Sequence, residues 1–107
     1  MTQLKMYVPD NADNAEDTQE YVNGAMCEQY GGTTVYSATG SWKDPNGRIV
    51  TEPVSVYETF TDNSAEKCVS FMDELAYQVK RRTNEDSVAY SINNDMFFEW
   101  TNGSTTF

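Results

Sequence analysis

The sequence contains no histidine among its 107 residues and only two cysteines, Cys27 and Cys68. The absence of histidine removes serine–histidine and cysteine–histidine catalysis, histidine-ligated zinc and the usual general base near neutral pH. Two cysteines cannot form a four-thiolate metal site either. We therefore expect no metal and no other cofactor, and two free thiols that pack as small apolar groups. Catalysis through carboxylates, tyrosine or lysine stays open, but the missing residues disfavour an enzyme.

Basic residues and long apolar stretches are also scarce. Seven lysines and arginines stand against 17 aspartates and glutamates, a formal net charge of −10. Because this charge repels phosphates, we expect no direct binding to nucleic acid. No stretch reaches the ~18 apolar residues of a membrane span, and the N-terminus lacks the apolar run of a signal peptide. We therefore expect a cytoplasmic protein that does not bind membranes, with its acidity serving solubility, salt adaptation or docking to a basic protein.

The remaining sequence predicts a single α+β domain. Alternating apolar residues indicate strands, apolar stripes at helical spacing indicate two amphipathic helices, and Asp-Pro-Asn-Gly marks a hairpin turn. The expected elements are strand 4–8, helix 14–30, strand 33–43, strand 49–61, helix 63–82, strand 87–93 and an optional strand 96–100. This order is the ferredoxin-like split βαβ arrangement, an antiparallel sheet with both helices on one face. We expect the domain to span residues 1–100 and residues 101–107 to form a flexible tail.

Local signals refine these boundaries. Asn14 and Asn63 are expected to cap the two helices, and Gly31 to end the first one in the left-handed conformation. Gly40 predicts a bulge or a point of close approach in its strand, and Pro53 predicts a bulge or a sheet edge. The sheet face away from the helices must be open or covered by another subunit, and we favour a homo-oligomer interface over a ligand platform.

Two aromatic residues lie on the first hairpin strand. Tyr36 and Trp42 are six residues apart, so both point to the same side of a regular strand. Because the intervening residues on that side are small, the two rings could leave a slot in which a flat ligand stacks. Ordinary packing of both rings is the alternative, and we favour it.

Two glutamates lie on the partner strand with the same spacing. Glu52 and Glu58 share their strand face with apolar residues, so they need partners. A structural ion pair with a nearby basic residue such as Arg48 or Arg81 is the favoured interpretation. The functional alternative is a carboxylate pair that holds a ribose hydroxyl or a cation, or that acts as acid and base together with Tyr57.

The basic residues are few enough to be treated one by one. Lys80, Arg81 and Arg82 form one cluster, which complements the dipole at the end of the second helix. Arginine also makes fork-like contacts to anions, so Arg48 and Arg81 are candidates for ligand contacts. Our predicted ligand-binding set is therefore Tyr36, Trp42, Arg48, Glu52, Glu58 and Arg81. No catalytic residue is predicted outright; for an enzyme, the candidates are Glu52, Tyr57 and Glu58.

The hairpin resembles a loose group of short, uncharacterised bacterial and phage proteins with a GG-T…G-W…E-P-V…E signature. The resemblance covers roughly residues 4–92 and includes Gly31-Gly32-Thr33, Gly40-Ser41-Trp42, Glu52-Pro53-Val54 and Glu58. Where those proteins often read Asn-Gln, this sequence has Asn84-Glu85. The resemblance implies a ferredoxin-like fold and no established activity.

Three hypotheses for the function follow. The leading one is a non-catalytic, oligomeric protein that sequesters a small polar, nucleotide-derived ligand, as a phage counter-defence protein in the host cytoplasm would. The second is an acidic inhibitor or nucleic-acid mimic that docks a basic protein through its first helix. The third is a carboxylate-dependent hydrolase or lyase.

Overall fold

The computed structural model describes residues 1–100 and 103–104. Its elements are β1 (Thr2–Pro9), α1 (Ala15–Tyr30), β2 (Thr34–Lys43), β3 (Ile49–Thr61), α2 (Ala65–Thr83), β4 (Ser87–Ile92), β5 (Asp95–Trp100) and β6 (Gly103–Ser104). The predicted order of helices and strands is confirmed, including the extra strand after β4. In the segment 101–107, which was expected to be a flexible tail, β6 pairs with β5. The other residues of this segment are not among those that the structure describes.

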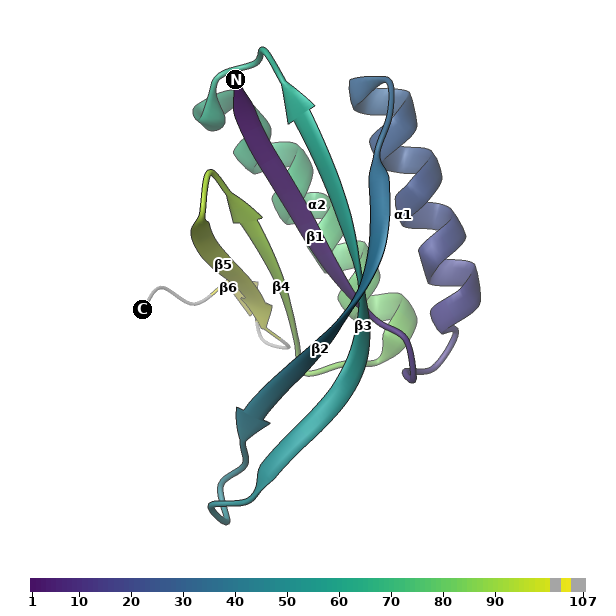
Figure 1. Ribbon diagram of the computed structural model, residues 1–107, viewed down its shortest axis with the longest axis vertical. Helices are drawn as coiled ribbons and strands as arrows, with labels where there is room; N and C mark the ends of the chain where they lie inside the picture. The colour runs from purple at the N-terminus through teal and green to yellow at the C-terminus, as the bar shows by residue number, and fades with distance from the viewer. Residues whose placement is uncertain (101–102, 105–107) are drawn as a thin grey trace.

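The strands form one antiparallel sheet of six, in the order β2-β3-β1-β4-β5-β6. Both helices cover the same face of this sheet, and the other face is open (Figure 1). This is the predicted α+β, ferredoxin-like split βαβ fold. None of the helices in the described residues is long and apolar enough to cross a membrane.

The core lies between the two helices and the sheet. Alternate residues of β1 point into it, as the period of a half-buried strand requires. The two helices contribute one apolar stripe each, at the predicted spacing. The largest fully buried apolar side chains of the core are Leu4, Met6, Val8, Val22, Met26, Met72, Val79 and Tyr90.

The ends of the helices differ in part from the prediction. Gly31 ends α1 at φ 90°, and its N–H donates to the Cys27 carbonyl, as expected. Asn14 is at the N-cap position of α1, as predicted, whereas the predicted cap at Asn63 is wrong, and neither N-cap residue makes a side-chain capping hydrogen bond. Asn14 has φ 55° and its Nδ2 donates to the Arg82 carbonyl at 3.1 Å, and α2 is preceded by Ser64 in place of Asn63, with no side-chain cap. Asn14 thus joins the start of α1 to the end of α2.

The β2–β3 hairpin is regular along its whole length. Gly40 lies directly opposite Glu52 in an unbroken register, so of the two roles predicted for this glycine the bulge is wrong. For Pro53 the sequence allowed a bulge or a sheet edge, and the structure shows the edge. The pairing of β3 with β1 ends at Val54, one residue after Pro53. The end of the hairpin, from about Gly40 onward, therefore projects from the body of the molecule (Figure 1).

Candidate functional site

The strand registers decide which side chains share the open face of the sheet. Lys5 lies opposite Glu58, whereas Met6 lies opposite Tyr57. Because directly opposed residues point to the same side, Glu58 is on the open face and Tyr57 is on the helix face. Tyr57 is 4% exposed and belongs to the core, where burial and then the charge of Asp10 raise its pKa.

The hairpin places both predicted pairs on this open face. Tyr36 lies opposite Val56, Trp42 opposite Val50, and Glu52 opposite Gly40. Since Val50, Glu52, Val56 and Glu58 alternate along β3 on one side, the aromatic pair and the glutamate pair all face away from the helices. The open face therefore carries the residues that the sequence singled out.

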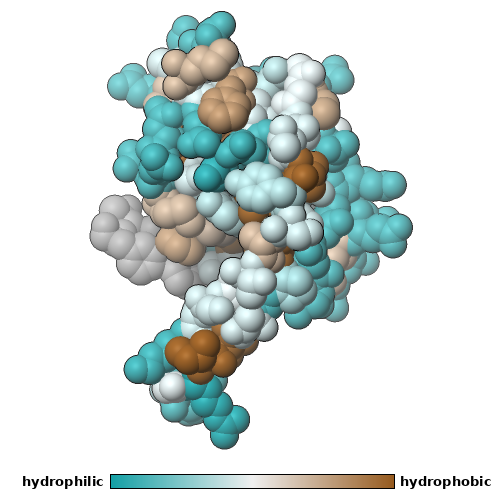
Figure 2. All heavy atoms as spheres, viewed as in Figure 1, coloured by the Kyte–Doolittle hydropathy of each residue, from teal (hydrophilic) through white to brown (hydrophobic). Residues whose placement is uncertain are grey.

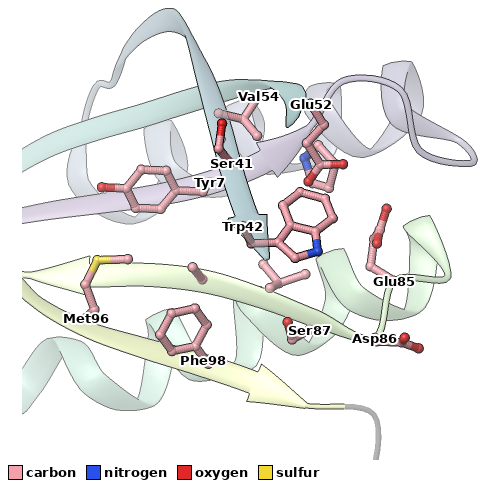
Figure 3. A pocket seen from close by; sticks show the side chains of 14 residues that line it. Tyr7, Ser41, Trp42, Glu52, Val54, Glu85, Asp86, Ser87, Met96 and Phe98 are labelled. Atoms are coloured by element: carbon pink, nitrogen blue, oxygen red, sulfur yellow. The ribbon is translucent and has the colours of Figure 1, made fainter. Parts of the chain in front are cut away.

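A cavity of about 660 Å³ opens on this face. Its lining comes from Tyr7 of β1, Trp42 of β2, Glu52 of β3 and, across the sheet, Met96 and Phe98 of β5 (Figure 3). The projecting hairpin forms one wall, and β4 and β5 form the other. The cavity exists because β3 extends beyond β1 and so leaves the hairpin to curve over the central strands.

One end of the cavity is apolar and aromatic. Tyr7, Met96 and Phe98 lie together there, and Met96 and Phe98 are 49% and 36% exposed (Figure 3). Exposed apolar side chains of this size around a hollow are typical of binding sites. This end can hold a flat apolar ring.

The other end is acidic. The Trp42 indole lies between Glu52 and Glu85, and Asp86 lies beside Glu85 (Figure 3). Burial raises the pKa of Glu52, and the charge of Glu85 raises it further. Burial likewise raises the pKa of Glu85, followed by the charges of Asp86 and Asp13. Of the described residues that line the cavity, none is lysine or arginine. This end therefore places carboxylates with raised pKa values, those of Glu52 and Glu85, next to an aromatic ring, which favours a cationic group.

The structure brings together two of the six predicted ligand residues. Trp42 and Glu52 line the cavity. Tyr36 is 40% exposed on the same face but outside the lining. Arg48 follows the hairpin turn, where its N–H donates to Asp44, and Arg81 is on α2 with its guanidinium 5.7 Å from the centre of a tyrosine ring.

Glu58, the sixth predicted residue, has structural partners. Its Oε2 accepts a hydrogen bond from Gln3 Nε2 at 2.9 Å and lies 3.8 Å from Lys5 Nζ. The ion pair expected for this glutamate thus forms with Lys5 and not with Arg48 or Arg81. Glu58 and Tyr57 point to opposite faces of the sheet, so the candidates Glu52, Tyr57 and Glu58 do not come together.

Twelve of the 14 lining residues were not in the predicted set, and those with large apolar, aromatic or acidic side chains on which the site depends are Tyr7, Glu85, Asp86, Met96 and Phe98. Tyr7 was foreseeable as a residue of the open face. Glu85 follows Asn84, whose left-handed conformation at φ 56° ends α2 and turns the chain toward β4. An acidic dipeptide between a helix and an inner strand is the signal that could have identified Glu85 and Asp86.

Two solved structures are similar to this chain over nearly its whole length. A phage SAM lyase in complex with S-methyl-5'-thioadenosine has 16% sequence identity and a TM-score of 0.71, covering 94% of this chain and 89% of its own. A phage SAM lyase in the apo state has 17% identity and a TM-score of 0.70, covering 97% and 92%. At these identities the likeness shows a common fold. No family model matches the sequence, and no curated protein matches it.

Proposed function

We propose that the cavity binds S-adenosylmethionine and that the protein cleaves it, releasing 5'-methylthioadenosine. The observation that carries this proposal is the cavity's two-ended lining, apolar and aromatic at one end and acidic at the other, with no basic residue among the described lining side chains. S-adenosylmethionine has the matching shape and charge: a flat adenine, a sulfonium and an ammonium group. The similarity in fold to a phage SAM lyase supports the same ligand class.

The lining suggests how this ligand would lie. The adenine fits the apolar end between Tyr7, Met96 and Phe98, where burial of a flat ring is favourable. The cationic part fits the acidic end, where the Trp42 ring offers a cation–π contact and Glu52 offers a carboxylate. The ligand would thus span the cavity from β5 to the hairpin.

The proposed cleavage needs no nucleophile from the protein. The carboxylate of the substrate attacks its own γ carbon, the bond from that carbon to sulfur breaks, and the electron pair of this bond stays on sulfur. The products are a lactone and the neutral thioether, so no water, oxidant or reductant is consumed. The attack cancels a negative charge against a positive one, and a cavity that excludes water favours such a step.

The acidic end of the cavity gives the protein a part in this chemistry. Glu52 and Glu85 repel the carboxylate of the substrate, and no lysine or arginine of the described lining competes for it. Apart from the substrate's own ammonium group on the neighbouring carbon, the sulfonium is then the positive group that the carboxylate can approach, which favours the folded, reactive conformation of the substrate.

We also propose that the protein is a homo-oligomer in which a second copy covers the open face. Apolar side chains interrupt the hydrophilic surface on this face (Figure 2). Exposed apolar side chains on this face include Tyr36, Trp42, Phe60, Met96 and Phe98. A second copy would shield them and enclose the ligand. Light scattering coupled to size exclusion should give a mass above that of one chain, and a monomer at micromolar concentration would contradict this part of the proposal.

The biological role that fits this proposal is phage counter-defence by depletion of S-adenosylmethionine in the host cytoplasm. The test of the activity is incubation of the purified protein with S-adenosylmethionine, followed by mass spectrometry. Formation of 5'-methylthioadenosine supports the lyase. Tight binding without any product would instead support the non-catalytic, sequestering role. A protein that neither binds nor cleaves the compound would refute the proposal.

A further inference from the structure

The acidic end of the cavity consists of groups that come from different parts of the chain. Glu52 is on β3 in the projecting hairpin, whereas Glu85 and Asp86 lie between α2 and β4. Glu52 and Glu85 both line the cavity, and the pKa of Glu52 is raised by burial and then by the charge of Glu85, so the two carboxylates repel each other. Like charges brought together by the fold raise the free energy of the empty site. A cation placed between them relieves this repulsion.

The proposed reaction changes the charge of the ligand. The substrate carries a sulfonium and an ammonium group, whereas the thioadenosine product carries neither. The aromatic contacts to adenine are the same for both. Among the described lining side chains, the interactions that differ between substrate and product are thus those of the carboxylates and the cation–π contact of Trp42, and the carboxylates carry the formal charge.

From this we infer that Glu52 and Glu85 form a charge selector, which retains the cationic substrate and lets the neutral thioadenosine product leave. This inference rests on the proposed function of the cavity. It assigns the two carboxylates a role in specificity and product release, separate from the aromatic side chains that hold the adenine. Without this selector, the product would compete with the substrate for the same aromatic contacts.

The selector should also respond to pH. The groups that face it are Asp86 and Asp13 beside Glu85, and Tyr7 in the lining. As the pH falls through the raised pKa values of Glu52 and Glu85, the carboxylates take up protons and lose their preference for cations. Affinity for a cationic ligand should then fall, whereas affinity for the neutral product should stay constant.

The test compares two ligands that are not consumed: sinefungin, an analogue with an amine in place of the sulfonium, and 5'-methylthioadenosine. Calorimetry is carried out on the wild type, Glu52→Gln, Glu85→Gln and the control Glu28→Gln, an exposed residue of α1 with the same change in charge. We expect each of the first two variants to raise the Kd of sinefungin roughly three- to fivefold. The Kd of methylthioadenosine should change by less than twofold, and the control should change neither.

The outcomes separate this inference from the proposed function. If the Gln variants bind both ligands equally more weakly, or if neither Kd changes, the inference of a charge selector is overturned and the cavity stays the binding site. If the wild type binds neither ligand, both proposals are wrong. A second measurement, on the wild type, covers the case in which a variant does not fold. Higher salt or lower pH should weaken the binding of sinefungin and leave the binding of methylthioadenosine unchanged. Equal responses of the two ligands would also overturn the selector.

Discussion

Replacing Gly40 by phenylalanine should close the cavity while leaving the fold intact. Gly40 lines the cavity on β2, and a Cβ added there would meet Val54 Cγ1 at 3.7 Å and the Glu52 carbonyl at 4.0 Å. These are ordinary contacts, so the first carbon fits without strain. The phenyl ring beyond it must then enter the space that we assign to the ligand. Phenylalanine is also a better strand residue than glycine.

The size of the effect follows from the contacts that would be lost. Displacing one stacked ring costs ~1–3 kcal/mol, which corresponds to a roughly 5- to 150-fold rise in Kd. Gly40→Ala adds only the Cβ and should change the Kd by less than about twofold, or ~0.4 kcal/mol. Thermal unfolding should show that both variants are as stable as the wild type, to within ~1 kcal/mol.

The assay is calorimetric titration with 5'-methylthioadenosine, and Thr39→Phe is the matched control. Thr39 is the neighbouring residue of β2, is exposed and points to the opposite face of the sheet. The control should bind as the wild type does. Unchanged binding by a folded Gly40→Phe protein would refute the assignment of the cavity as the ligand site.

Further predictions concern the ligand platform, the core and the pH response. Trp42→Ala should raise the Kd of 5'-methylthioadenosine roughly 5- to 150-fold. The melting temperature should change little, because Trp42 is 46% exposed. A loss of stability without a loss of binding would contradict the proposed contact. Glu58→Gln should leave the rate of S-adenosylmethionine cleavage unchanged and lower the free energy of unfolding by less than ~1 kcal/mol, since its ion pair is partly exposed. A folded variant without activity would instead give Glu58 a catalytic role. Met6→Ala should lower the unfolding free energy by ~2–5 kcal/mol in denaturant titrations, because Met6 is fully buried, and a loss below 1 kcal/mol would contradict the core assignment. A raised carboxyl pKa in the folded state means that the folded protein binds more protons, so ionisation of Glu52 and Glu85 lowers stability as the pH rises above their ordinary range near 4.5. Glu52→Gln should accordingly raise the melting temperature at pH 7 and not at pH 4, and a uniform shift at both values would argue against this cause.

The fold was predictable because its signals are local. Each helix carries one apolar stripe, each inner strand alternates, and the Asp-Pro-Asn-Gly turn joins two adjacent strands. The same logic placed Tyr36 with Trp42 and Glu52 with Glu58 on common faces, which the register confirms. For Gly40 the sequence predicted a bulge or a point of close approach, and the register excludes the bulge. Local sequence does not distinguish these two reasons for a glycine in a strand.

The cavity was only partly predictable, because it depends on distant segments. Trp42 and Glu52 come from the hairpin, but Glu85 precedes β4, and Met96 and Phe98 belong to β5. Their meeting depends on the strand order and on where β1 stops pairing with β3. Arg48 and Arg81 were chosen for an anionic ligand, whereas the described lining is acidic and suits a cation. The reversal follows from the three carboxylates that the fold gathers at one end.

The most direct test of the central claim is a crystal structure of the protein with 5'-methylthioadenosine. The account predicts the nucleoside in the cavity on the open face, with adenine against Tyr7 and Phe98 and its thioether end near Trp42 and Glu52. A nucleoside bound elsewhere on the molecule, or an empty cavity at saturating concentration, would contradict it.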